Sequence, residues 1–215
     1  MITTLLFDFD GTLANTYPII MFAFQSIFKE FDGRDISELE IASMFGPAED
    51  EIIKQQFKTH SHPNSIIERY YELYEGFHSQ YVQAESDLVQ MIDTFHQDGY
   101  KLGIITGKGR RSLDISLRHC FPESSFHVSI AGDEVQNPKP HPEGLRKALQ
   151  QLQTEPENAV FIGDSDFDFK AGQAAGVKTI GVKWFDKADN FAWKSATPDT
   201  QADSIAHLVD MFMPA

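Results

Sequence analysis

Short apolar segments alternate with amphipathic segments along most of the chain. Apolar runs rich in β-branched residues predict buried strands at residues 3–7, 101–106, 126–131, 159–162 and 178–182. Between these runs, apolar residues spaced three and four positions apart predict helices, as in residues 88–95 and 145–152. Strands that alternate with helices in this way predict an α/β fold with a Rossmann-like parallel sheet and helices on both of its faces.

Residues 15–84 interrupt this alternation because they carry helical patterns alone. The patterns cover residues 18–31, a short segment opened by the capping-box sequence Ser37-Glu38-Leu39-Glu40, residues 47–57, and a tyrosine-rich stripe at residues 66–81. A helical block inserted after the first strand of an α/β domain predicts an all-helical cap over residues 15–84. Residues 1–14 and 85–215 are then expected to form the α/β core.

The charge of the chain excludes several classes of partner. Its 215 residues include 18 Lys and Arg against 32 Asp and Glu, for a formal net charge of −14. Nucleic acids and anionic membranes require a basic surface, so neither is expected as a partner. No apolar run approaches the roughly 20 residues of a membrane span, and the first residues lack the pattern of a signal peptide. The lone cysteine, Cys120, fits a reducing, cytoplasmic location, and no pattern indicates an oligomeric state.

Acidic residues gather where the first predicted strand ends. Asp8 and Asp10 are followed by Gly11, which allows the backbone to turn and approach a ligand closely. Open α/β sheets bind ligands at the carboxyl ends of their strands. One of these carboxylates can therefore act as a nucleophile while the other transfers protons, whereas the alternative interpretation is a solvated turn.

Polar residues also follow or lie between the later strands. Thr106 and Gly107 end the second predicted strand and can bind phosphate oxygens, and Lys139 lies between two prolines that stiffen its backbone. The segment Gly163-Asp164-Ser165-Asp166-Phe167-Asp168 follows another strand. Asp8, Asp10 and Asp164 would repel one another unless a cation lay among them, and oxygen ligands favour a hard ion such as Mg²⁺.

In this order, the segments resemble the motifs of the haloacid dehalogenase superfamily of phosphatases. The matching residues run from Asp8-Phe9-Asp10-Gly11-Thr12 through Thr106 and Lys139 to Gly163-Asp164 with Asp168. The helical block resembles the C1-type cap of that superfamily. Residues 138–145 and the Phe45-Gly46-Pro47 turn are most similar to phosphoglycolate phosphatases and a related group of pyrophosphatases.

The resemblance implies a role for each matching residue. Asp8 would be the nucleophile, and Asp10 would be the general acid and base. Mg²⁺, the implied cofactor, would be held by Asp8, Asp164 and the backbone carbonyl of Asp10. Phosphate oxygens would be bound by Thr106, Gly107 and Lys139. The supporting residues would be Gly11, Ser165 and Asp168, the last of which would orient either Lys139 or a metal-bound water.

The expected function is therefore that of a phosphoric monoester hydrolase. It would hydrolyse a small phosphorylated metabolite through an aspartyl-phosphate, and phosphoglycolate, pyrophosphate and a sugar phosphate all remain open as substrates. A β-phosphoglucomutase-like mutase is the nearest alternative, although the few cations of residues 15–84 favour hydrolysis. A third hypothesis is that the chain is a non-catalytic phosphate-sensing protein.

Several other residues are open to a functional or a purely structural interpretation. Lys108, Arg110 and Arg111 are interpreted as a solvated basic turn at a helix start, with attraction of an anionic substrate as the alternative. The Phe45-Gly46-Pro47 turn either contacts the substrate or only joins two helices. The tyrosines of residues 70–81 are expected in the core of the helical block.

Overall fold

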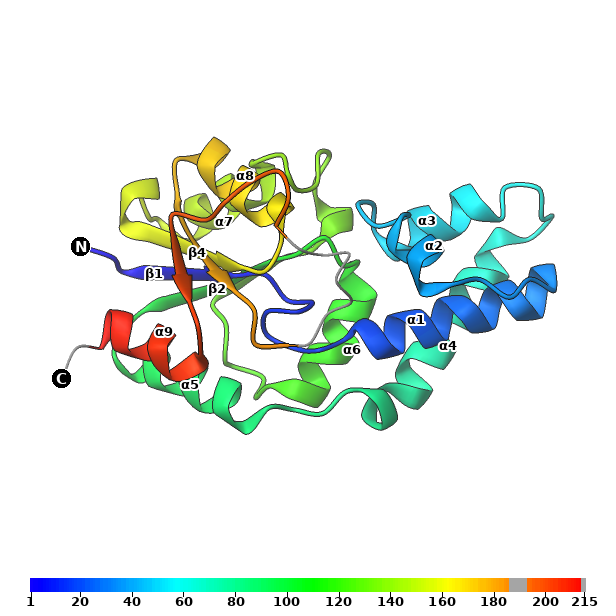
Figure 1. Ribbon diagram of the computed structural model, residues 1–215, viewed down its shortest axis with the longest axis horizontal. Coiled ribbons are helices and arrows are strands. Elements are labelled where there is room, and N and C mark those ends of the chain that lie inside the picture. The colour runs from blue at the N-terminus through cyan, green and yellow to red at the C-terminus, as the bar shows by residue number, and fades with distance from the viewer. Residues whose placement is uncertain (186–192, 214–215) are drawn as a thin grey trace.

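The computed structural model describes residues 1–185 and 193–213, and its centre is a six-stranded parallel sheet in the order β3-β2-β1-β4-β5-β6 (Figure 1). The strands are β1 (Thr4–Phe7), β2 (Lys101–Ile105), β3 (Val128–Ile130), β4 (Ala159–Gly163), β5 (Lys178–Val182) and β6 (Thr200–Ala202). Every residue of β1 is buried, as expected for a central strand of a parallel sheet. The predicted α/β fold is thus confirmed.

Helices cover both faces of the sheet. They are α5 (Ser86–Gln97), α6 (Arg110–Cys120), α7 (Glu143–Leu152), α8 (Asp166–Ala175) and α9 (Ile205–Phe212), with short 3₁₀ turns at Gly132–Glu134 and Pro156–Asn158. Leu6 of β1 packs into a core with residues of α7 and α8, whereas Leu5 and Phe7 pack into a core that includes residues of α5. Alternate side chains of the strand therefore support opposite layers of helices.

The register of the sheet sets where the candidate site forms. Phe7 of β1 pairs with Ile104 of β2 on one side and with Ile162 of β4 on the other. The three strands therefore end at the same level. The residues that follow them, which include Asp8, Thr106 and Asp164, emerge together at one edge of the sheet.

The helical patterns of residues 15–84 correspond to observed helices. These are α1 (Tyr17–Ile27), which continues into a π-helical turn at Phe28–Asp32, then α2 (Glu38–Ala42), α3 (Glu49–Gln56) and α4 (Pro63–Tyr81). They lie beyond the end of the sheet at which β1 ends (Figure 1). Within the described residues, no helix combines the length and apolar character needed to cross a membrane.

Aromatic packing and one capping box hold these helices in place. The rings of Phe24 and Tyr70 join α1 to α4 with centroids 4.8 Å apart, and Tyr74 is fully buried, as expected for the tyrosine stripe. At α2, the Ser37 hydroxyl accepts from the Glu40 amide, and the Glu40 carboxylate accepts from the Ser37 amide. This capping box agrees with the sequence pattern.

A buried polar cluster joins α4 to α6. Ser116 lies 2.8 Å from the Tyr74 hydroxyl and 3.0 Å from Nε2 of His78, measured from its Oγ. Burial and the nearby charges of His119 and Lys108 lower the pKa of His78 to about 4. His78 therefore stays neutral at physiological pH and adds no charge to the contact between the helical block and the α/β core.

Sequence patterns did not predict the last two elements. β6 has only three residues, of which Thr200 and Gln201 are exposed, so it lacks the apolar run of a central strand. It lies at the edge of the sheet, where pairing with β5 alone maintains it. α9 follows directly and packs near α5. The predicted α/β core also includes residues 186–192 and 214–215, which lie outside the described residues.

Candidate active site

The loop after β1 folds tightly around the backbone of Phe9. The amide of Asp8 still donates to the Ile162 carbonyl (2.8 Å), as though the strand continued for one residue. The Phe9 carbonyl then accepts from the amides of Thr12, Leu13 and Ala14, and Gly11 adopts φ = 81°. The turn leaves both Asp8 and Asp10 lining the same pocket, as the sequence spacing predicts.

Asp8 forms a buried ion pair with Lys139. The Lys139 ammonium lies 2.8 Å from Oδ1 of Asp8 and 2.6 Å from Oδ1 of Asp168. The second oxygen of Asp168 accepts from the amide and hydroxyl of Ser165, at 3.0 and 2.6 Å. Burial alone would lower the pKa of Lys139, but the charges of Asp168 and Asp8 raise it above its ordinary value. Of the two roles considered for Asp168, these contacts favour orientation of Lys139.

The position of Asp168 requires a glycine at the end of β4. A Cβ atom at Gly163 would lie 2.6 Å from both Cβ and Cγ of Asp168, closer than side-chain atoms approach in folded proteins. Any other residue at this position would therefore displace the carboxylate that holds Lys139. The Gly163-Asp164 pair of the sequence motif thus has a steric reason as well as a chemical one.

Buried carboxylates cluster beside this ion pair and fit a metal ion. One oxygen from each of Asp8, Asp164 and Asp168 lies within 4.8 Å of the others, and all three residues are buried. Burial and the charges of Asp168 and Asp10 raise the pKa of Asp8 to about 6, against the opposing effect of Lys139. An all-oxygen set of this kind suits Mg²⁺, whose charge would offset the repulsion. Thr12 holds Asp164 by a hydrogen bond of 3.2 Å.

Thr106 and Gly107 lie on the opposite side of the pocket from the motif after β4. The amide of Thr106 donates to the Ile130 carbonyl (3.1 Å), which extends β2 toward the pocket. A Cβ at Gly132 would lie 2.2 Å from the Gly107 carbonyl oxygen, so the loop can occupy this position only beside a glycine. Gly132 was not identified from the sequence, where a lone glycine after a short strand carries no specific signal.

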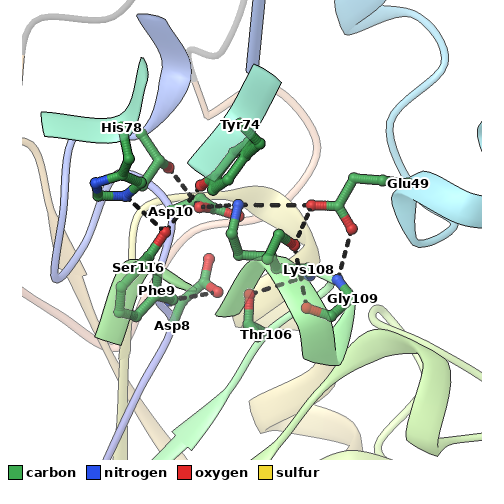
Figure 2. Close-up of polar contacts among 12 residues, drawn as sticks. Asp8, Phe9, Asp10, Glu49, Tyr74, His78, Thr106, Lys108, Gly109 and Ser116 are labelled. Atoms are coloured by element: carbon green, nitrogen blue, oxygen red, sulfur yellow. Dashed lines mark hydrogen bonds and ion pairs between the residues drawn. The ribbon is translucent and has the colours of Figure 1, made fainter. Parts of the chain in front are cut away.

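Lys108 corrects the interpretation of the basic turn. Its side chain is fully buried, and its ammonium lies 3.2 Å from Oδ1 of Asp10 and 3.5 Å from Oε1 of Glu49 (Figure 2). It also lies 4.7 Å from the centre of the Tyr74 ring. Although burial opposes it, the charges of Asp10, Tyr74 and Glu49 raise the pKa of Lys108. The prediction of a solvated residue was wrong here because the helical block covers this turn.

The other two basic residues do lie at the surface. Arg110 pairs with Glu134 and Arg111 with Glu68, and the arginine side chains are 29% and 48% exposed. The solvated interpretation therefore holds for these two and fails for Lys108 alone. Local sequence could not separate them, since the three residues lie within four positions.

Glu49, in the first turn of α3, reaches from the helical block to the α/β core. Its Oε2 accepts from the amide of Gly109 at 2.7 Å (Figure 2). Its Oε1 accepts from the hydroxyl of Ser112 at 2.6 Å. The residue is 6% exposed. Neither Glu49 nor its contact with Lys108 was identified from the sequence. The available signal was its place two positions after the Phe45-Gly46-Pro47 turn.

A pocket of about 280 Å³ joins these groups. Its polar lining includes the predicted site residues Asp8, Asp10, Thr106, Gly107, Lys139, Asp164 and Ser165, together with Glu49 and Lys108. Its remaining walls are mostly apolar, and they include Phe45, Gly46 and Pro47. The turn at residues 45–47 therefore contributes to the pocket rather than only joining two helices. Gly11 and Asp168 do not line the pocket themselves. Gly11 allows the turn after Asp10, and Asp168 holds Lys139.

The burial of the Lys108 ammonium between two carboxylates can be tested by its effect on protein stability. We expect Lys108→Met to lower the free energy of unfolding by about 3–5 kcal/mol, because it leaves the buried Glu49 beside the partly exposed Asp10 without a cation. Arg111→Met, which removes an exposed ion pair, should cost less than about 1 kcal/mol. Urea denaturation of both variants measures the difference. Equal losses would show that Lys108 is not the buried partner described above.

The family model, the relatives and a solved structure all point to one protein family. A family model described as haloacid dehalogenase-like hydrolase matches residues 5–182. Pyrophosphatase PpaX of Bacillus cereus (strain ATCC 10987 / NRS 248) is 30% identical over 208 residues, which cover 97% of this chain and 95% of the relative. Pyrophosphatase PpaX of Anoxybacillus flavithermus (strain DSM 21510 / WK1) is 33% identical over 185 residues, covering 85% and 84%. The crystal structure of CbbY from Rhodobacter sphaeroides in complex with phosphate is similar, with a TM-score of 0.81, 26% identity, and coverage of 97% of this chain and 96% of that one.

Proposed function

Since the chain belongs to the haloacid dehalogenase-like hydrolase family, we propose that it is a Mg²⁺-dependent phosphatase acting on a small phosphorylated metabolite. The observation that carries the proposal is the buried Asp8, paired with Lys139 at 2.8 Å and sharing its pocket with Asp10. This arrangement combines a nucleophile, a cation for the phosphate charge and a second carboxylate for proton transfer. The phosphatase and pyrophosphatase activities of the family agree with it.

In the first step, a carboxylate oxygen of Asp8 attacks the phosphorus atom of the substrate. The bond between phosphorus and the leaving oxygen breaks, and Asp10 donates its proton to that oxygen. The product is an aspartyl-phosphate on Asp8. Lys139, Thr106 and the amide of Gly107 bind the phosphate oxygens and fix the direction of attack, which supplies much of the rate in phosphoryl transfer.

In the second step, the Asp10 carboxylate takes a proton from a water molecule. The water oxygen attacks phosphorus, the bond to Asp8 breaks, and orthophosphate leaves. Thr16 donates a hydrogen bond to Oδ1 of Asp10, and Lys108 lies 3.2 Å from the same oxygen. These two contacts fix the carboxylate for both proton transfers.

The metal site proposed for Mg²⁺ consists of Asp8, Asp164 and the backbone carbonyl of Asp10. The bound ion would place positive charge between the Asp8 carboxylate and the substrate phosphate, two anions that otherwise repel each other. Ser165 and Asp168 complete the surroundings by holding Lys139 in position. Asp8 and Asp164 belong to the buried all-oxygen cluster described above, which supports their part in this assignment.

Residues 15–84 are proposed to act as a cap that opens to admit substrate and closes to exclude bulk water. The hinges would lie at residues 13–16 and 83–87, where the chain passes between the α/β core and the helical block. In this proposal, the hydrogen bonds of Glu49 with Gly109 and Ser112 belong to the closed state of the cap and break when it opens. The mutase alternative would need a cap that retains a phosphorylated intermediate, and no observation specifically favours it. The cytoplasm is the proposed location.

The catalytic assignment predicts the effect of two conservative substitutions. Asp8→Asn should abolish phosphate release, because the amide cannot form the aspartyl-phosphate. Asp10→Asn should lower kcat by roughly 10²–10⁴-fold through loss of proton transfer. The assay is phosphate release with Mg²⁺, repeated with EDTA, which should stop turnover. Asp35→Asn, at an exposed surface ion pair, is the matched control. Ordinary Mg²⁺-dependent activity in Asp8→Asn would refute the proposal.

Closure of the cap can be tested with an engineered disulfide. A Cβ at Gly109 would lie 3.6 Å from the Cβ of Ala48, within the range of a disulfide. The Ala48→Cys/Gly109→Cys variant should lose at least roughly tenfold in kcat on oxidation, because the cap cannot open, and reductant should restore it. Burial raises the pKa of Cys120 to about 11, so it should not compete. Gly109→Cys alone is the control, because its Cβ would also lie 2.8 Å from Oε2 of Glu49. Full activity with a verified disulfide would contradict cap opening.

A further inference from the structure

Carboxylates outnumber lysines among the charged groups that line the pocket. Lys108 is buried and the Lys139 side chain is only 10% exposed, and each lies between two carboxylates: Lys139 between Asp8 and Asp168, and Lys108 between Asp10 and Glu49. Lys194 also lines the pocket, but it is exposed to solvent. Among the residues that the structure describes, the buried part of the pocket therefore offers no lysine or arginine to a second anionic group of a substrate that is not already paired with carboxylates.

The second lysine lies where the leaving group must be. Asp10 protonates the leaving oxygen in the proposed reaction, so the groups around Asp10 surround the alcohol portion of the substrate. When Asp10 is ionised, Asp10, Glu49 and Lys108 carry a net charge of −1. When Asp10 carries its proton, Glu49 and Lys108 cancel. In neither state is this end of the pocket positively charged.

The remaining walls at this end are apolar. Ile20, Phe24 and Ile52 are buried lining residues, and Tyr17, Phe45 and Phe167 also line the pocket, whereas the charged lining residues Asp166 and Lys194 lie in the segments after β4 and β5. Apart from the Tyr17 hydroxyl, the aliphatic and aromatic side chains provide no hydrogen bonds for a phosphate or carboxylate, whose removal from water without a partner is unfavourable. They do provide contact area for carbon atoms of a substrate.

We propose that the substrate is a phosphomonoester of an uncharged, partly apolar alcohol, and that Glu49 selects against substrates with a second anionic group. This inference rests on the proposed phosphatase function and narrows it. Pyrophosphate, a bisphosphate or phosphoglycolate would place that second group beside Glu49 and Asp10. Repulsion of a wrong substrate is a common source of specificity.

Glu49 is held too firmly to move aside for an anion. Its two oxygens accept hydrogen bonds from Gly109 and Ser112, in addition to the ion pair with Lys108 (Figure 2). Rotation of the carboxylate away from Lys108 would leave the buried amide of Gly109 without its acceptor. A second phosphate therefore cannot take over Lys108 without breaking these contacts.

The test uses substrates that differ in one charge. Ethyl phosphate and phosphoglycolate share a two-carbon skeleton, and only the latter has a carboxylate; benzyl phosphate and pyrophosphate extend the comparison. We expect the wild-type enzyme with Mg²⁺ to show kcat/KM values at least tenfold higher for ethyl and benzyl phosphate than for phosphoglycolate and pyrophosphate. Glu49→Gln should raise the ratio of phosphoglycolate to ethyl phosphate at least tenfold. Glu51→Gln, an exposed neighbour on α3, should leave that ratio unchanged.

Each outcome separates this inference from the proposed function. A preference for pyrophosphate or phosphoglycolate in the wild-type enzyme would overturn the substrate class and leave the phosphatase function intact. Absence of phosphate release from all members of the panel would refute both. If Glu49→Gln has the thermal stability of the wild type and also keeps its ratio of phosphoglycolate to ethyl phosphate turnover, Glu49 is not the residue that selects the substrate. If that variant does not fold, the wild-type ranking alone decides the substrate class.

Discussion

The buried ion pair between Asp8 and Lys139 is the interaction on which the rest of the site depends. A carboxylate removed from water beside Asp168 would otherwise become neutral, as its raised pKa indicates, and would then be a poor nucleophile. Lys139 opposes this tendency from 2.8 Å away, and Asp168 and Ser165 hold the lysine in place. Gly163 supplies the space for Asp168. Asp168 and Ser165, which follow β4, thus support Asp8, the proposed nucleophile after β1. They do so through Lys139, which belongs to a third segment of the chain.

A second lysine repeats this arrangement at the other end of the pocket and joins the helical block to the sheet. Lys108 belongs to the loop after β2, whereas Glu49 belongs to α3, and Asp10 follows β1. The position of Asp10, the proposed general acid, is therefore coupled to the position of the helices that cover it. The same three charges leave no excess positive charge for the alcohol portion of a substrate. The proposed cap closure, proton transfer and substrate selection would therefore all depend on this one cluster.

Much of the fold could be predicted from local patterns. Strands with continuous apolar runs, the capping box at Ser37 and the helical block all have signals within a few residues of one another. The acidic loop and the later motifs could likewise be read from residue type and spacing. Lys108, Glu49 and Gly132 could not, because their roles arise from contacts between distant segments. Glu49 and Gly109, for example, are 60 positions apart, and only the packed helices bring them within 2.7 Å.

In the proposed reaction, the phosphoryl group passes through a covalent bond to Asp8. Borohydride added to the enzyme quenched during turnover reduces an acyl phosphate to the alcohol, which converts an aspartyl-phosphate into homoserine. Mass spectrometry of the N-terminal peptide then locates the change. The account predicts homoserine at position 8 in the presence of Mg²⁺ and substrate, and none without substrate. Steady phosphate release with Asp8 unmodified, or with homoserine at another position, would contradict it.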